Sequence, residues 1–228
     1  MSKPTISFIL LAYNEQHCIA QAIRDCRVFA QTHCASYEVL VIDDGSSDDT
    51  NQIAIDASED GDVRVITHPH NAGMGASMRD GYLAARCDYL VHLPGDRQVR
   101  AEALEEMVGG CAKDRVVLSQ FSNPPSGRRR AAMSVAFRLL TRHVGGLRVD
   151  FAGTYLFHRD WLSKVDLTAA SSDTFLFSFQ LLELFRRAGA SFSIVTIPTH
   201  LREQGTSRVA TLPRVVSMFM EIGKARMG

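Results

Sequence analysis

The stretch that most constrains the fold runs over Val39–Thr50. It opens with an unbroken run of apolar residues and passes directly into Asp43 and Asp44. A short apolar run without polar alternation is typical of a strand buried on both faces. Gly45 and the Ser/Asp cluster after it predict a turn, and a helical pattern begins at the end of the stretch. Because ligands bind beyond the carboxyl ends of strands in open α/β sheets, the two carboxylates are candidates for holding a polar ligand.

The same two carboxylates have a simpler interpretation. Asp side chains often close turns and cap helix N-termini by accepting hydrogen bonds from backbone N–H groups. On this interpretation, Asp43 and Asp44 stabilise the turn before the helix and contact no ligand. The segment by itself leaves both interpretations open.

The rest of the chain repeats this alternation of strand and helix. Strands are predicted over 6–12, 37–43, 63–67, 89–93, 116–120, 154–158 and 192–197. Helices are predicted over 15–30, 50–58, 76–85, 101–111, 131–144, 178–188 and 212–228. This order predicts an α/β fold with a parallel, doubly wound sheet and right-handed crossovers. No repeat or linker divides the 228 residues, so we expect one domain over 1–228.

Composition argues against several classes of protein. Lys+Arg and Asp+Glu both number 25, so no bulk positive charge favours nucleic acid. No apolar run approaches the ~18 residues that suggest a membrane span. The five cysteines show neither a Cys-x-x-Cys pair nor zinc spacing, and we expect buried free thiols in a reducing compartment. The N-terminus lacks a secretory pattern, and we therefore expect a cytoplasmic protein.

Motifs follow the predicted strands in a fixed order. The first four are Ala12-Tyr13-Asn14-Glu15, Asp43-Asp44-Gly45-Ser46, Asn71-x-Gly73-x-Gly75 and Pro94-x-Asp96-x-Gln98. Two more follow in the second half: Asp150-Phe-Ala-Gly153, and Arg202 with Gly205-Thr-Ser207-Arg208. Together they resemble the family-two glycosyltransferases with the GT-A fold. The likeness covers roughly residues 5–210, and is strongest to the branch that contains dolichyl-phosphate mannose synthase and related polyprenyl-phosphate sugar transferases.

This resemblance implies a Rossmann-like, mostly parallel sheet flanked by helices, and a nucleotide sugar (a UDP- or GDP-hexose) as donor. It implies a nucleotide-binding half over about 1–100, an acceptor half over about 101–210 and a terminal amphipathic helix over 211–228. The nucleotide-binding residues would be Ala12, Tyr13, Glu15, Asp43, Asp44, Asn71, Gly73 and Asp96. Packing for Tyr13, helix-terminal charge for Glu15 and a simple turn at the glycines remain open as alternatives.

The chain departs from the family at Pro94. The family has Asp-x-Asp after the fourth strand, and Pro94 replaces the first Asp. A hard cation such as Mg2+ or Mn2+ prefers oxygen ligands and takes much of its shell from phosphates and water. Asp96 and Gln98 are therefore the metal-ligand candidates, with a plain tight turn as the alternative. Arg97 and Arg100 are expected on a solvated face, although they could supply charge where the Asp is missing.

The acceptor side needs cations if the acceptor is a polyprenyl phosphate, because Arg binds phosphate oxygens in a fork. The acceptor-binding candidates are Arg128, Arg129, Arg130, Arg202, Ser207 and Arg208. The basic loop and the terminal helix could touch anionic headgroups at the inner face of the membrane. Packing of that helix on the domain or in a homodimer is the alternative.

A phosphate acceptor needs no general base, whereas a hydroxyl acceptor needs a carboxylate. Asp150 and Asp173 are the candidates for that base, although Asp173 also has the pattern of a helix N-cap. The catalytic candidates are Asp96, Asp150 and Arg202. His92 and His158 are expected to be buried and hydrogen-bonded. We predict an inverting hexosyltransferase, with transfer to a glycan or small-molecule hydroxyl and a non-catalytic nucleotide-sugar-binding subunit as rivals.

Overall fold

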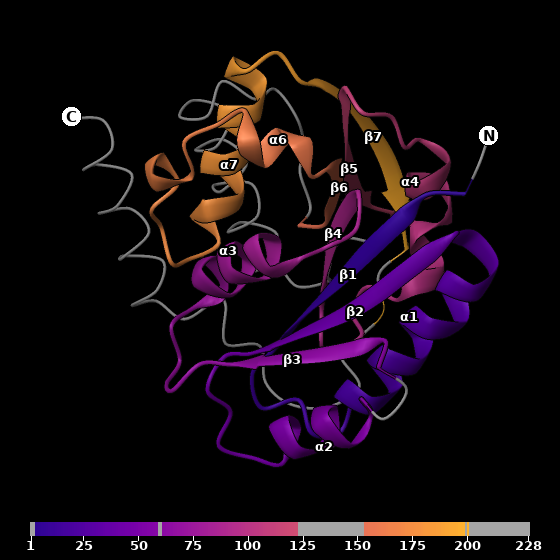
Figure 1. Ribbon diagram of the computed structural model, residues 1–228, viewed down its shortest axis with the longest axis vertical. Helices are drawn as coiled ribbons and strands as arrows, with labels where there is room; N and C mark the ends of the chain where they lie inside the picture. Colours follow the sequence, from indigo (N-terminus) through magenta and orange to yellow (C-terminus); the bar gives the residue numbers. More distant parts are fainter. Residues whose placement is uncertain (1–2, 59–60, 123–152, 199, 201–228) are drawn as a thin grey trace.

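A single mixed sheet forms the centre of the computed structural model, which describes residues 3–58, 61–122, 153–198 and 200. It has 7 strands in the order β3-β2-β1-β4-β6-β5-β7 (Figure 1). The strands are β1 (Thr5–Ala12), β2 (Ser36–Asp43), β3 (Val63–Thr67), β4 (Tyr89–Pro94), β5 (Arg115–Phe121), β6 (Tyr155–His158) and β7 (Ser191–Ile197). Every predicted strand is confirmed. The sheet is mostly parallel, but β6 runs antiparallel to both β4 and β5.

The helices agree less closely with the predicted ranges. They are α1 (Ile19–His33), α2 (Thr50–Asp56), α3 (Met74–Ala84), η1 (Ala101–Leu104), α4 (Glu105–Gly109), α6 (Asp160–Ser163), η2 (Leu167–Ala169) and α7 (Leu176–Arg187). The helix predicted over 101–111 is a 3-10 turn followed by a short α-helix. The predicted helices over 131–144 and 212–228 lie outside the described residues. No helix in the described ranges is long and apolar enough to cross a membrane.

Alternating side chains give the sheet two buried faces. Along β1, Phe8 and Leu10 join the core under α1, α2, η1 and α4, whereas Ile9 joins the core under α3, α6 and α7. Figure 1 shows these two sets of helices on opposite sides of the sheet. Each fully buried large apolar side chain contributes roughly 1.5–3 kcal/mol relative to its exposed state. The continuous apolar runs recognised in the sequence are thus strands covered on both faces.

The cysteines form no disulfide in the structure. Cys18, Cys26 and Cys34 are buried, and Cys87 and Cys111 are half-buried. Burial raises the pKa of Cys34 to about 11 and that of Cys111 to about 12. The expectation of buried free thiols holds for the first three and in part for the other two.

Candidate functional site

The strand register brings three loops to one edge of the sheet. Ala12 pairs with Asp43 across β1 and β2, and Leu11 pairs with Pro94 across β1 and β4. These strands are parallel and end at the same level, so the segments that follow them meet beyond their carboxyl ends. Tyr13, Glu15 and Asp96 are thereby brought to the edge where Asp43 and Asp44 lie, as the motif order predicts.

Hydrogen bonds tie the first loop to the second. Asn14, whose φ is 56°, donates its backbone N–H to Ser46 Oγ at 2.9 Å, and Ser47 N–H donates to Asn14 Oδ1 at 2.8 Å. Glu15 N–H donates to Thr50 Oγ1 at 2.8 Å. Glu15 is 9% exposed. The loop that carries Tyr13 and Glu15 is therefore held beside the turn after β2, in one fixed arrangement.

Asp43 closes the turn after β2. Its side chain is almost fully buried; Oδ1 accepts the Ser46 N–H at 3.1 Å and Oδ2 accepts Asn51 Nδ2–H at 3.1 Å. The turn-closing interpretation of Asp43 is thus confirmed. The N-cap residue of α2 is Asp49, which makes no side-chain capping hydrogen bond, so neither Asp43 nor Asp44 caps this helix. Just before it, the backbone N–H of Thr50 donates to Asp48 Oδ1 at 3.0 Å, which closes a local turn. A contact between Asp43 and a nucleotide stays a prediction.

Asp44 organises the loop that follows β3. Its Oδ1 accepts the Ala72 N–H at 2.8 Å, its Oδ2 accepts the Gly73 N–H at 3.0 Å, and His68 Nδ1 lies 2.8 Å from Oδ1. The other ring nitrogen of His68 lies 3.1 Å from Asp80 Oδ2 on α3. Asp44 thus holds the predicted nucleotide-binding residues Asn71 and Gly73 against the end of β2. His68 was missed because a single histidine after a strand gives no distinctive pattern.

The glycines after β3 let another segment of backbone approach closely, as predicted. In this structure that segment belongs to the protein itself and is not a ligand. A Cβ on Gly73, where φ is 99°, would lie 2.3 Å from the Asp173 carbonyl oxygen, and one on Gly75 would lie 2.3 Å from the Ser172 carbonyl oxygen. Gly75 N–H donates to the Asp173 carbonyl at 2.9 Å. The glycines therefore join the start of α3 to the segment before α7.

Asp173 is not the N-cap of α7, which begins at Leu176 and has Phe175 as its N-cap. The Asp173 carboxylate instead accepts Arg79 Nη1–H at 3.2 Å. The same guanidinium donates to the Ala170 and Ser172 carbonyls. Arg79 was missed in the sequence because its partners lie far away along the chain.

The loop after β4 carries the two predicted metal ligands. Gly95 N–H donates to the Leu11 carbonyl at 2.8 Å, and Gln98 N–H donates to Asp96 Oδ1 at 3.0 Å. Arg97 Nε lies 2.8 Å from Asp25 Oδ2 on α1, and the Arg97 side chain is 13% exposed. The expectation that Arg97 lies on a solvated face is wrong. Within the described ranges, no group of three or more His, Cys, Asp and Glu side chains could hold a metal ion.

His92 and His158 are buried, as predicted. Tyr82 Oη lies 2.7 Å from His92 Nδ1, and His92 Nε2 lies 2.8 Å from the Gly153 carbonyl. Since only a protonated Nε2 can donate to that carbonyl, Nδ1 accepts the Tyr82 hydroxyl proton. Burial lowers the pKa of His92 to about 4 and keeps the ring neutral. The backbone N–H of Asp160 donates to His158 Nδ1 at 3.2 Å.

Several predicted site residues lie outside the described part of the chain. They are Asp150, Arg128, Arg129, Arg130, Arg202, Ser207 and Arg208. The assignment of the catalytic Asp150 and Arg202, and of the whole acceptor-binding set, therefore stays a prediction.

Residues 7–165, more than half of the chain, match the family model described as glycosyl transferase family 2. The chain belongs to this family. A curated relative, undecaprenyl-phosphate 4-deoxy-4-formamido-L-arabinose transferase of Salmonella choleraesuis (strain SC-B67), is 24% identical over 223 residues. The match covers 95% of this chain and 66% of that protein.

Solved structures of similar fold are glycosyltransferases of the GT-A type. Glucosyl-3-phosphoglycerate synthase from Mycobacterium tuberculosis, in complex with Mn2+, UDP and glucosyl-3-phosphoglycerate, superposes with a TM-score of 0.70 at 20% identity, covering 98% of this chain and 79% of that one. Mannosyl-3-phosphoglycerate synthase from Rubrobacter xylanophilus gives a TM-score of 0.65 at 16% identity, covering 97% and 75%. The predicted GT-A fold is confirmed.

Proposed function

We propose that this enzyme transfers a hexose from a UDP- or GDP-sugar to a polyprenyl phosphate, with inversion at the anomeric carbon. One observation carries the donor assignment. Hydrogen bonds that Asn14 donates to Ser46 and accepts from Ser47, and one that Asp44 accepts from Ala72, tie together the loops after β1, β2 and β3. This unit gathers an aromatic ring and several carboxylates, which suit base stacking and the N–H and hydroxyl donors of a nucleoside. The mycobacterial structure with bound UDP supports the same donor class.

Asp96 and Gln98 fit a divalent ion that arrives together with the diphosphate. Mg2+ and Mn2+ need only one or two carboxylates when phosphates and water complete the shell. A single carboxylate beside an amide oxygen meets that need, but would hold a free ion weakly. When bound, the cation would neutralise charge on the departing diphosphate. The chain's own part is to hold the Asp96 carboxylate beside the strand edge, where the Asp96 side chain accepts the Gln98 N–H.

The acceptor assignment follows from the relative that acts on undecaprenyl phosphate, according to its name. A phosphate oxygen attacks the anomeric carbon while the bond to the diphosphate breaks, so direct displacement inverts that carbon and needs no general base. Arg128–Arg130, Arg202, Ser207 and Arg208 would hold the phosphate. Such an acceptor implies peripheral contact with the inner face of the membrane. A homodimer through the 211–228 segment is the alternative to membrane contact by that segment.

A hydroxyl acceptor is the second candidate, and the position of Asp173 favours it. The Asp173 side chain is 61% exposed and accepts a hydrogen bond from Arg79, while its backbone lies against Gly73 at the edge of the donor loops. A carboxylate in that place could take the proton of an attacking hydroxyl. The mycobacterial synthase, solved in complex with phosphoglyceric acid, supports a small acceptor as the second candidate.

The test is a transfer assay with UDP- and GDP-hexoses and a panel of polyprenyl phosphates, glycans and small hydroxyl compounds. We expect transfer to a polyprenyl phosphate, complete loss of transfer in Asp96→Ala and retained transfer in Asp173→Asn. Transfer to hydroxyl compounds alone, with loss in Asp173→Asn, would replace the lipid-phosphate proposal with the second candidate. Absence of transfer and of donor hydrolysis with every sugar nucleotide would refute both.

A further inference from the structure

Arg97, between the two proposed metal ligands, has a backbone conformation that L-residues seldom adopt. Among the described residues, only Asn14 and Arg97 combine a side chain with a positive φ, at 56° and 59°. Both lie in loops at the carboxyl edge of the sheet. This conformation is costly for a residue with a Cβ, and it persists only where the surroundings hold it in place. Something must therefore hold the loop at Arg97.

Arg97 forms an ion pair with the neighbouring helix α1. Arg97 Nε lies 2.8 Å from Asp25 Oδ2, and the two side chains are 13% and 9% exposed. Asp25 lies on the buried stripe of α1, among apolar neighbours such as Ile23 and Cys26. Its other oxygen accepts Gln21 Nε2–H at 2.8 Å. A carboxylate buried in such a stripe needs a cationic partner, which fixes where the Arg97 side chain must go.

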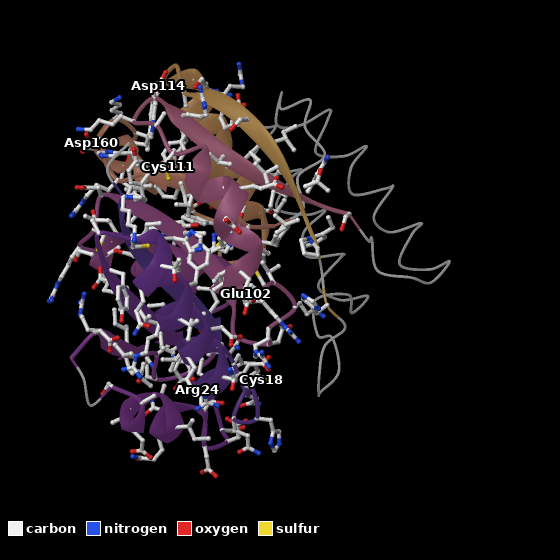
Figure 2. All side chains as sticks on the ribbon, turned by 90° about the vertical axis from the view of Figure 1, so that its right-hand side faces the viewer. Cys18, Arg24, Glu102, Cys111, Asp114 and Asp160 are labelled. Atoms are coloured by element: carbon white, nitrogen blue, oxygen red, sulfur yellow. The ribbon has the colours of Figure 1, made fainter. Side chains whose placement is uncertain are left out.

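Backbone hydrogen bonds hold the loop on either side of Arg97. The loop is held at its start by the bond from Gly95 N–H to the Leu11 carbonyl, and after Arg97 by the bond from His200 N–H to the Gln98 carbonyl at 3.0 Å. The ion pair between Arg97 and Asp25 lies between these two backbone hydrogen bonds and connects the loop to α1. Figure 2 looks onto α1 and η1, with Arg24 of α1 and Glu102 of η1 labelled.

We propose that Asp25 and Arg97 are positioning residues that hold Asp96 and Gln98 in the geometry needed for a nucleotide-bound divalent cation. This inference rests on the proposed function. The resemblance implies that Pro94 stands where the family has one of its carboxylates, and the placement of Asp96 then matters more. Asp25 lies behind the loop on α1 and acts through Arg97. The pair gives the loop a rigid support that the short strand-edge turn lacks by itself.

The test is Mn2+ titration followed by electron paramagnetic resonance, with saturating UDP or GDP. The variant Asp25→Leu/Arg97→Leu removes both charges, so no unpaired charge is left buried. The variant Asp25→Leu/Arg97→Gly also removes the ion pair, but its glycine tolerates the positive φ at position 97. The matched control is Arg27→Leu/Asp62→Leu, which deletes another α1 ion pair (2.6 Å, side chains 19% and 20% exposed). Asp62 lies just before β3, at the amino ends of the parallel strands, whereas Asp96 lies beyond their carboxyl ends.

We expect the Leu/Leu variant to bind Mn2+ about 10- to 100-fold more weakly, as for other groups that orient metal ligands. The Leu/Gly variant should recover part of that loss, and the control should keep the wild-type affinity. Unchanged affinity in Leu/Leu, or an equal loss in the control, overturns the inference while the metal site itself stands. If the wild type binds no Mn2+ with nucleotide, or Asp96→Ala binds it equally well, the metal site of the proposed function is wrong and the inference falls with it.

Discussion

Replacing Gly75 with alanine tests how the start of α3 is joined to the segment before α7. The new Cβ would lie 2.3 Å from the Ser172 carbonyl oxygen and 2.7 Å from that of Thr174. Both neighbours are backbone atoms, which cannot turn away as a flexible side chain can. The chain must shift, and the bond from Gly75 N–H to the Asp173 carbonyl is strained or lost.

The expected cost has two parts. Overpacking a tight site costs about 1–3 kcal/mol, and losing one hydrogen bond costs about 1 kcal/mol more. The free energy of unfolding should therefore fall by about 2–4 kcal/mol. For a chain of this size that corresponds to a decrease in Tm of roughly 4–16 °C.

The assay is urea unfolding followed by circular dichroism, with Gly109→Ala as the matched control. Gly109 ends the short helix α4, and a Cβ there would meet no atom within 4 Å. The control should therefore unfold within about 0.5 kcal/mol of the wild type, as surface substitutions usually do. A Gly75→Ala protein as stable as this control would refute the packing of α3 against the Ser172–Thr174 segment.

Two further outcomes follow from buried titratable groups. Burial lowers the pKa of His92 to about 4, against an ordinary value of 6.5. Because the folded pKa lies below the unfolded one, the stability that neutral His92 contributes is complete above about pH 6.5 and is lost as the pH falls, by about 3 kcal/mol at pH 4. Urea unfolding at pH 7 and pH 4 should show a smaller acid loss in His92→Phe, and an equal loss would contradict this. Burial also raises the pKa of Cys34 and Cys111 to about 11 and about 12. Both thiols should react slowly with a disulfide reagent in the native protein at mildly alkaline pH and rapidly in concentrated urea; fast native labelling would argue against their burial.

The sequence predicts the strands well and the contacts between distant segments poorly. Unbroken apolar runs such as Val39–Ile42 occur where helices cover both faces of a sheet, so strand positions followed directly. The reversed direction of β6 left no such signal, since direction depends on how the chain returns to the sheet. Single-turn helices such as α6, over Asp160–Ser163, are too short to show a repeating apolar pattern.

In the candidate site, too, the positions at the ends of the strands were predicted, whereas contacts between distant segments were not. The strand-edge rule brought Glu15, Asp43 and Asp96 to one edge, because parallel strands end at a common level. The turn-closing role of Asp43 was also predicted, from the turn chemistry of Asp. The two long-range contacts of Asp44 with Ala72 and Gly73 were not predicted. Nor was the bond between Arg79 and Asp173, whose residues lie 94 positions apart. One feature of the sequence could have indicated the Arg97–Asp25 pair. Asp25 is a carboxylate next to the apolar stripe of the predicted helix over 15–30, and such a carboxylate needs a partner.

The proposed function requires that the strand-edge loops bind a nucleotide sugar and that Asp96 holds the accompanying cation. The most direct measurement is the thermal shift produced by UDP- and GDP-sugars, each with and without Mn2+, in the wild type and in Asp96→Ala. We expect a rise in Tm with one nucleotide class, a further rise when Mn2+ is added, and no effect of Mn2+ alone. Asp96→Ala should lose the metal-dependent part. A wild type that responds to no nucleotide, or a metal effect that survives in Asp96→Ala, would contradict the account.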